Sequence, residues 1–198
     1  MVILSDYYLN DNVLYLAQNL IGKYIFTQID GQIAGGIITE TEAYQGITDK
    51  ASHAFGGRRT QRNEMMYAKG GVIYVYMCYG VHFLLNIVTN QRDIPDAILI
   101  RSIIPTHGEE LMLKRTGKLK VTPDLAQGPG KVSKCLGINK LHNGLSLNSD
   151  MVWLENRDLL ISPEGIIASP RIGVDYAAED ALRPNRFYLS DYSQLIDR

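Results

Sequence analysis

The chain has 198 residues, of which 45% are hydrophobic and seven are proline, and this size and composition suit one compact globular domain. Two cysteines are too few for a disulfide framework, and the first residues lack the basic start and apolar run of a secretory signal, so we expect an intracellular protein, in the cytoplasm of a prokaryote or the nucleus of a eukaryote. A formal net charge of −1 gives no electrostatic reason to expect a polyanionic partner, so any such reason must be local.

The first half of the chain predicts one helix followed by extended segments. Residues 10–23 place apolar side chains at helical spacing, with Asn10 or Asp11 as the N-cap and Gly22 where the helix should end. The extended segments are rich in β-branched and aromatic residues and are separated by glycine, Asp-Gly and proline-containing breaks. They cover residues 23–29, 32–44, 71–79, 81–90 and 96–104.

The second half predicts helices at 108–115 and 128–138, the latter with Pro129 in its first turn and Gly137 at its end. Short strands at 152–157 and 159–163, a short helix at 177–182 and a last strand at 186–189 complete the order. Together these elements predict an α+β fold: a single domain with a mostly antiparallel curved β-sheet, peripheral helices and a protruding aromatic β-hairpin.

The longest apolar stretch, residues 71–88, approaches the length of a membrane span, but tyrosines, polar residues and a central Gly80 interrupt it. A buried hairpin is therefore expected in place of a membrane segment. Tyr74 and Tyr76 share one face of this hairpin. A three-residue loop at 79–81 would pair Asn86 with Tyr74 and place it on that face, whereas a two-residue loop would send it to the other; we favour the longer loop.

Tyr79 lies at the expected turn of this hairpin, beside a glycine and between basic segments of the chain. Two interpretations apply to it about equally. Its ring is either part of the core or a flat aromatic group that stacks on, or wedges between, nucleobases.

Two carboxylates share one face of the predicted strand at 32–44. Because side chains alternate along an extended segment, Ile38, Glu40, Glu42 and Tyr44 are expected to point the same way. An exposed strand face explains this pattern simply. Alternatively, a carboxylate partly desolvated beside an aromatic ring has a raised pKa and can act as a general base toward water. The glutamates, roughly 6.5–7 Å apart, also fit, weakly, the acid–base pair of an inverting sugar hydrolase.

Positive charge is concentrated in residues 49–69, where Arg58, Arg59 and Arg62 lie, and this run is either a solvated face or a track for phosphates. The four histidines form no short-range pair on a helix face and no Cys-x-x-Cys occurs, so we expect no metal. No Gly-x-Ser-x-Gly elbow, phosphate-binding loop or complete dinucleotide fingerprint is present, and we expect no cofactor.

Several motifs occur in order along the chain: ETEAYQG, ASHAFGGRRTQRN, GGVIYVYMCYGVHFLLNIV, AILIRSIIP, GPGKVSKCLGIN, PRIGVDYA and RPNRFYL. In order and spacing they closely resemble the alkyladenine (3-methyladenine) DNA glycosylase family. The resemblance implies one DNA glycosylase domain over residues 1–198. It implies a monofunctional base-excision-repair enzyme that flips a damaged purine out of duplex DNA, hydrolyses its N-glycosidic bond and leaves an abasic site. The damaged purines implied are of the 3-methyladenine, 7-methylguanine, hypoxanthine and ethenoadenine class.

The resemblance also implies catalytic and base-binding residues. Glu42 matches the general base that activates the attacking water, and Arg101 matches an arginine that helps to hold that water and Glu42. The flipped base is expected to stack between Tyr44, His53 and Tyr76, because electron-rich rings attract alkylated purines that carry positive charge.

Further positions match residues that select the base and bind DNA. Asn86 matches the residue that crowds the exocyclic amino group of guanine, Ile172 a pocket position that acts through its backbone, and Tyr79 the intercalating residue that fills the gap left by the flipped nucleotide. Phosphate contacts are expected from Arg58, Arg59 and Arg62. The expected partner is double-stranded DNA carrying a damaged purine, with no membrane, and we expect a monomer.

Two other classes of function stay open from the residues alone. A non-catalytic nucleic-acid-binding module would use the hairpin tyrosines and the basic loops and would not need Glu42. A hydrolase of free nucleosides or sugars would use Glu40 with Glu42 and would need neither the basic loops nor Tyr79. Activity on an alkylated duplex, compared with a free nucleoside, separates all three classes.

Overall fold

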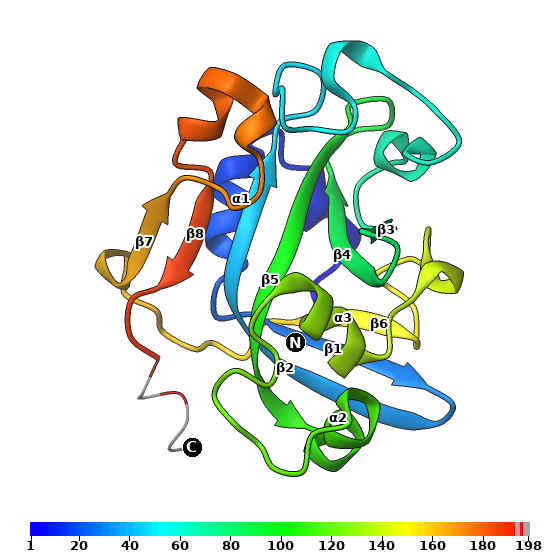
Figure 1. The fold of residues 1–198 in the computed structure, drawn as a ribbon, viewed down its shortest axis with the longest axis vertical. Coiled ribbons are helices and arrows are strands. Elements are labelled where there is room, and N and C mark those ends of the chain that lie inside the picture. Colours follow the sequence, from blue (N-terminus) through cyan, green and yellow to red (C-terminus); the bar gives the residue numbers. More distant parts are fainter. Residues whose placement is uncertain (193–194, 196–198) are drawn as a thin grey trace.

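A computed structural model describes residues 1–192 and residue 195 of the chain (Figure 1). The α-helices of the described part are α1 (Val13–Asn19), α2 (Glu109–Thr116) and α3 (Pro129–Leu136). The strands are β1 (Tyr24–Ile29), β2 (Gln32–Tyr44), β3 (Ile73–Cys78), β4 (His82–Thr89), β5 (Asp96–His107), β6 (Val152–Glu155), β7 (Ile166–Ser169) and β8 (Arg186–Leu189). Short 3-10 helices lie in the connections, at Ser5–Leu9, Phe55–Gly57, Glu64–Tyr67, Lys140–His142, Pro163–Gly165 and Asp175–Leu182.

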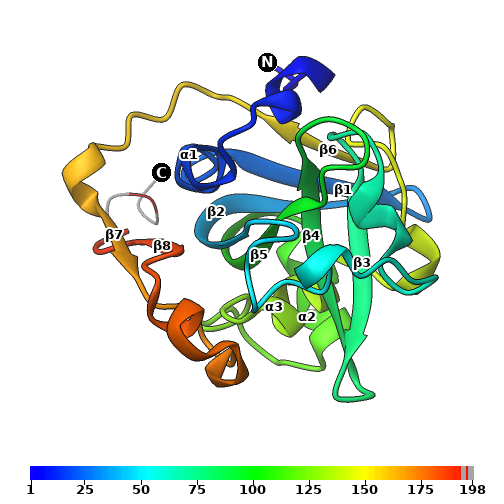
Figure 2. The ribbon, with the colours of Figure 1, turned by 90° about the horizontal axis from the view of Figure 1, so that it is seen from above.

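The central strand of the sheet is β2, because it pairs with β1, β5 and β8, each time in the antiparallel direction. Its first half pairs with β1, its second half pairs with β8, and β5 runs along most of its length. The strands follow the order β3-β4-β5-β2-β1-β6, and β7 pairs with β8. The result is a mostly antiparallel sheet with helices at its periphery (Figures 1 and 2), which confirms the predicted α+β fold.

Helix α1 packs on β2 and β5 through its apolar face, and α3 packs on β4 and β5. The N-cap of α1 is Asn12, whose side chain accepts the backbone N–H of Tyr15 at 3.0 Å. The prediction of Asn10 or Asp11 as the cap was wrong. The Asn10 side chain instead accepts the backbone N–H of Asn12 at 2.8 Å and so shapes the turn before the helix.

The predicted strand at 159–163 was also wrong. Residues 157–162 have no regular structure, Leu160 is 95% exposed, and a 3-10 helix begins at Pro163. The strand of this region is β7, which pairs with β8, and an apolar run becomes a strand only where a partner edge is available. The helix predicted at 177–182 is a 3-10 helix, interrupted at Ala178, where φ is 51°.

Two β-bulges decide which side chains of β2 face the site. Between Ile38 and Glu40, β2 carries an extra residue relative to β5, and one step later β5 carries an extra residue, Arg101. A bulge interrupts the alternation of side chains between the two faces of a strand. Ile38 therefore belongs to the main buried core with Ala43, and does not lie beside Glu40 and Glu42 as simple alternation predicts.

Strands β3 and β4 form the predicted hairpin with the longer of the two loops. Cys78 pairs with His82, and Asn86 pairs with Tyr74, so residues 79–81 make the turn. Tyr79 is 87% exposed at its tip, and this contradicts the core interpretation of that residue. In the part of the chain that the structure describes, no helix combines the length and apolar content needed to cross a membrane.

Gly36→Ala tests the close approach of β2 to β5. A Cβ atom at Gly36 would lie 2.3 Å from the carbonyl oxygen of Ile104, a backbone atom that can move only with its strand. We expect the free energy of unfolding to fall by about 1–3 kcal/mol. The control is Gly165→Ala, where an added Cβ meets no atom within 4 Å. Urea unfolding measures both variants, and equal midpoints would contradict this constraint.

Candidate active site

Glu42, in the second half of β2, is a fully buried carboxylate with a donor at each oxygen. The Tyr44 hydroxyl donates to Oε2 at 2.8 Å, and the backbone N–H of Ile172 donates to Oε1 at 2.8 Å. Nη1 of Arg101 lies 3.3 Å from Oε1. Burial raises the pKa of Glu42, while the charge of Arg101 and the hydrogen bonds from Ile172 and Tyr44 oppose the rise. The carboxylate is thus held in one orientation and has an increased proton affinity.

Arg101 comes from the bulge on β5 and lies between two glutamates. Its Nε donates to Oε1 of Glu40 at 2.9 Å, and its Nη1 faces Glu42. Arg186 of β8 also lies within 3.3 Å of Glu40. Burial disfavours the charged guanidinium, but the two carboxylates outweigh it, and the pKa of Arg101 is raised. Glu40 is therefore engaged by two guanidinium groups, whereas Glu42 borders an open cavity.

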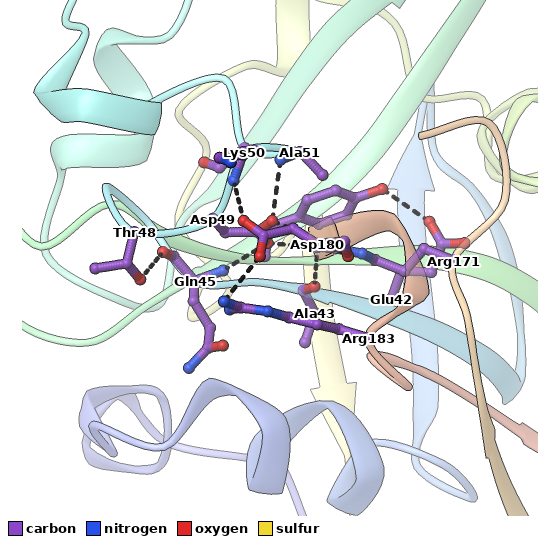
Figure 3. A network of polar contacts seen from close by, with 12 residues as sticks. Glu42, Ala43, Gln45, Thr48, Asp49, Lys50, Ala51, Arg171, Asp180 and Arg183 are labelled. Carbon is purple, nitrogen blue, oxygen red and sulfur yellow. Dashed lines mark hydrogen bonds and ion pairs between the residues drawn. The ribbon is translucent and has the colours of Figure 1, made fainter. Parts of the chain in front are cut away.

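A second buried ion pair joins the loop after β2 to the segment of residues 171–182 (Figure 3). The guanidinium of Arg171 forms a bidentate pair with the carboxylate of Asp49, and both side chains are fully buried. Arg171 also donates to the backbone carbonyls of Ala43 at 2.9 Å and Asp180 at 3.1 Å. Its guanidinium carbon lies 4.7 Å from the centre of the Tyr44 ring. These contacts fix the segment that supplies the N–H donor to Glu42.

Aromatic rings form one wall of the site. Tyr74 and Tyr76 stack with ring centroids 5.4 Å apart, and His53 meets Tyr76 edge-on at 4.6 Å. Nδ1 of His53 lies 3.0 Å from the Tyr74 hydroxyl. Burial, and then the positive charges of Arg62 and Arg58, lower the pKa of His53 to about 4. At neutral pH this wall therefore carries no charge on its imidazole.

A cavity of about 550 Å³ brings the predicted catalytic, base-binding and intercalating positions together. Its lining includes Glu42, Tyr44, His53, Tyr76, Tyr79, Asn86, Arg101 and Ile172. Asn86 is buried in its wall, and its amide nitrogen donates to the carbonyl oxygens of Tyr74 at 3.1 Å and Leu84 at 3.3 Å. Ile172 contributes its backbone N–H and a half-exposed side chain.

The three arginines predicted to contact phosphate differ in their surroundings. Arg58 and Arg62 line a second cavity of about 470 Å³, together with Lys50 and Thr60. His53, Arg62 and Tyr176 line both cavities, so the two adjoin. Arg59 lines neither. It is held by Glu64 at 2.6 Å and Asp93 at 2.7 Å, with its guanidinium over the ring of Tyr67.

Sequence reasoning missed three residues of this site: Asp49, Arg171 and Tyr176. Tyr176 lines both cavities and donates its hydroxyl to the carbonyl of Ala51 at 3.1 Å. Arg171 and Tyr176 lie in the motif PRIGVDYA, but only Ile172 was singled out there. No periodicity or spacing pairs two residues that are 122 positions apart, so only the fold reveals the contact of Asp49 with Arg171.

The arrangement can bind a flat ring and direct water at it. Electron-rich tyrosine faces attract a planar cation, and a neutral imidazole beside them does not repel one. A buried, hydrogen-bonded carboxylate with a raised pKa suits a general base that takes a proton from water. Among the described residues, no group of three or more His, Cys, Asp or Glu side chains is arranged to hold a metal ion.

Comparison with known proteins gives matches along the chain. A family model described as methylpurine-DNA glycosylase matches residues 7–193. A protein of Chlamydia felis is 45% identical over 187 residues, which cover 94% of this chain and 95% of that protein. Relatives from Bdellovibrio bacteriovorus, 42% identical over 97% of each chain, and Clostridium perfringens, 39% identical over 94% of each, also match. All three carry the name "Putative 3-methyladenine DNA glycosylase".

The low pKa of His53 can be tested by following the ring protons of this histidine through a pH titration by NMR. We expect a midpoint near pH 4 in the folded protein. Because the unfolded chain takes up this proton near pH 6.5, the free energy of unfolding should fall as the pH is lowered from about 6.5 toward 4. His53→Gln should remove that part of the slope. A His53 midpoint above pH 6 would contradict its burial among cations.

Proposed function

This chain belongs to the methylpurine-DNA glycosylase family, and we propose that residues 1–198 form one monofunctional DNA glycosylase domain that excises alkylated or deaminated purines. The proposed substrates are 3-methyladenine, 7-methylguanine, hypoxanthine and ethenoadenine in double-stranded DNA. The proposal is carried by one observation: the buried carboxylate of Glu42 accepts two hydrogen bonds, pairs with Arg101 and borders an aromatic cavity. A damaged nucleotide must leave the base stack to reach such a cavity.

The proposed reaction is hydrolysis with Glu42 as the general base. The oxygen of a water molecule attacks C1′ of the sugar while the N-glycosidic bond breaks, and the bonding electron pair leaves with the purine. Glu42 takes the proton that the attacking water loses. Arg101 and the N–H of Ile172 favour the ionised form of Glu42, which this step requires, while burial raises the pKa of Glu42 and so makes it a stronger base. A cationic alkylated purine becomes neutral as it leaves and needs no further proton. A neutral purine such as hypoxanthine must take up a proton from solvent on the ring as the bond breaks, so its excision should be slower and more sensitive to pH.

Base recognition is assigned to the walls of the cavity. Tyr44 and Tyr76 would stack on the flipped purine, and the neutral ring of His53 would border it without repelling a cation. Asn86 is buried and held by two backbone carbonyls, so it cannot swing away to admit a larger base edge. This rigidity supports its proposed role in crowding the exocyclic amino group of guanine.

DNA would bind over the hairpin and the neighbouring basic cavity. The exposed ring of Tyr79 is available to fill the gap that a flipped nucleotide leaves. Arg58 and Arg62 line the second cavity and are the better candidates for phosphate contacts. Arg59 would have to give up Glu64 or Asp93 to bind a phosphate. We also propose that the enzyme acts as a monomer, away from membranes.

The two alternative classes receive less support from the site. A non-catalytic nucleic-acid module has no use for a buried carboxylate that is oriented by hydrogen bonds at the wall of a cavity. A hydrolase of free nucleosides has no use for an exposed tyrosine at a hairpin tip. In addition, two guanidinium groups pair with Oε1 of Glu40, and this favours its ionised form and disfavours a Glu40–Glu42 acid–base pair.

Glu42→Gln should abolish base excision and leave binding to a lesion-containing duplex largely intact. An amide keeps the shape of the side chain but cannot accept the proton of the attacking water, so we expect a loss of about 10²–10⁴-fold. Single-turnover release from a duplex with one hypoxanthine or ethenoadenine, with a gel shift on the same duplex, measures both effects.

The matched control is Glu40→Gln, on the same face of β2, whose amide oxygen can still accept from Arg101. It should retain excision within about tenfold. Near wild-type release by the Glu42 variant, with an inactive Glu40 variant, would show that the general base is the other glutamate. If neither change affects release, the base lies outside this strand.

Tyr79→Ala should impair flipping more than chemistry. Its ring would replace stacking worth a few kcal/mol, so release from a paired lesion should slow by about 10- to 100-fold, and release from a mismatched lesion by less. The control is Tyr15→Ala, which removes another exposed tyrosine, on α1. Equal losses on paired and mismatched lesions would mean that Tyr79 does not act as a wedge.

A further inference from the structure

The ion pair of Asp49 and Arg171 connects three separate parts of the cavity wall. Arg171 precedes Ile172, whose N–H binds Glu42. The guanidinium of Arg171 binds the carbonyl of Ala43, the residue between Glu42 and Tyr44. The contacts are reciprocal. The side chain of Arg171 binds the backbone of β2 at Ala43, and the backbone N–H of Ile172 binds the side chain of Glu42. Neither contact can shift without the other.

Asp49 anchors this arrangement to the loop that leads to His53. Its Oδ1 accepts the backbone N–H of Ala51 at 3.0 Å, and its Oδ2 accepts that of Gln45 at 3.3 Å. Burial disfavours the charged carboxylate, but the hydrogen bonds from Arg171 outweigh it, and the pKa of Asp49 is lowered. The pair therefore stays ionised at neutral pH, with Asp49 fixed to the loop after β2 and Arg171 fixed to the segment of residues 171–182.

The guanidinium of Arg171 also lies on the face of the Tyr44 ring, 4.7 Å from its centre. Tyr44 in turn donates its hydroxyl to Glu42 at 2.8 Å. The two hydrogen-bond donors to Glu42, the hydroxyl of Tyr44 and the N–H of Ile172, are thus held by the same buried guanidinium. The ion-pair partner of Glu42, Arg101, is positioned independently, by β5 and Glu40.

We propose that Asp49 and Arg171 are positioning residues for base excision, acting as a clamp that sets the N–H of Ile172 and the ring of Tyr44 on Glu42. This inference rests on the proposed function for its effect on rate. Neither residue is assigned contact with substrate. Their effect reaches the reaction through the orientation and protonation of Glu42, because a general base displaced by a fraction of an ångström loses its alignment with water.

The charged and titratable groups around Glu42 come from every element that packs on it. They are Glu40 and Tyr44 of β2, Tyr76 of β3, Arg101 of β5, Arg186 of β8, and Arg171 and Tyr176 of the 171–182 segment. Since Glu42 must be ionised to act as a base, the rate should fall at acid pH with a midpoint set by its pKa. A duplex carrying 7-methylguanine is the suitable probe, because this cationic base needs no proton in order to leave.

Asp49→Asn and Arg171→Lys both test the clamp. The first substitution removes a negative charge, and the second leaves the charge of the side chain unchanged. In Asp49→Asn the charge of Arg171 is no longer balanced, and its electrostatic attraction alone would lower the pKa of Glu42 and move the midpoint of the pH–rate profile to lower pH. Loss of the hydrogen bond from Ile172 would instead raise the pKa of Glu42 and move this midpoint to higher pH, because the bond favours the ionised carboxylate. Arg171→Lys keeps the charge but cannot make the bidentate pair. We expect a higher midpoint for both variants.

The single-turnover rate constant, measured with saturating enzyme, should fall by about 10- to 100-fold in both variants. This constant refers to folded, bound enzyme, so reduced stability alone does not lower it. The matched control is Glu179→Gln, which removes one negative charge from the same segment by breaking the exposed pair with Lys50. It should keep the wild-type rate constant and midpoint. If Asp49→Asn does not fold, Arg171→Lys carries the test.

Amide hydrogen exchange in the free protein provides a readout that does not depend on activity. The Ile172 amide should exchange about tenfold or more faster in both variants, relative to β5 amides that report global opening. Wild-type values of rate, midpoint and Ile172 exchange would overturn the clamp while leaving the proposed function intact. A midpoint that moves to lower pH in Asp49→Asn would also overturn it. If wild-type enzyme releases no base, the proposed function fails, and exchange alone decides whether the clamp exists.

Discussion

A carboxylate without solvent contact can remain ionised only if hydrogen-bond donors and charges of the protein replace water, and Glu42 imposes this requirement on its surroundings. The donors and the charge come from three places: the hydroxyl of Tyr44 on the same strand, the guanidinium of Arg101 on β5, and the N–H of Ile172 in a segment 130 residues further along the chain. Each of these groups is fixed by a further contact. The residues that satisfy this buried charge therefore also form part of the cavity wall.

The position of Glu42 on β2 makes this convergence feasible. β2 is the strand that meets β1 on its first half, β8 on its second half and β5 along most of its length. A bulge on β5 brings Arg101 between Glu40 and Glu42, and Arg186 of β8 reaches Glu40. The two glutamates thereby differ although they are two residues apart. Glu40 pairs with two guanidinium groups, whereas Glu42 pairs with one and lines the cavity.

The two adjoining cavities differ in charge. The first cavity suits a flat cation, and the second suits a polyanion. The first is walled by tyrosines and by His53, whose pKa is held near 4 by burial and by the neighbouring arginines. The second collects Lys50, Arg58 and Arg62. Burial is the main reason that the imidazole of His53 is uncharged at neutral pH, and the arginines that offer positive charge at the second cavity add to this effect. The formal net charge of −1 for the whole chain gives no indication of this local difference in charge between the two cavities.

Local pattern determined much of this protein: the α+β order, the long strands, and the hairpin with its three-residue loop. These follow from periodicity and turn chemistry, whereas the site residues expected at the first cavity followed from the resemblance of the motifs to a family, which left out Tyr176. Other features depend on contacts between distant residues. A bulge in β2 places Ile38 in the core. The segment of β7 forms a strand because it pairs with the edge of β8. Arg59 is held in ion pairs with Glu64 and Asp93. The pair of Asp49 with Arg171 forms only when the sheet brings residues 122 positions apart together, since no local spacing encodes such a contact.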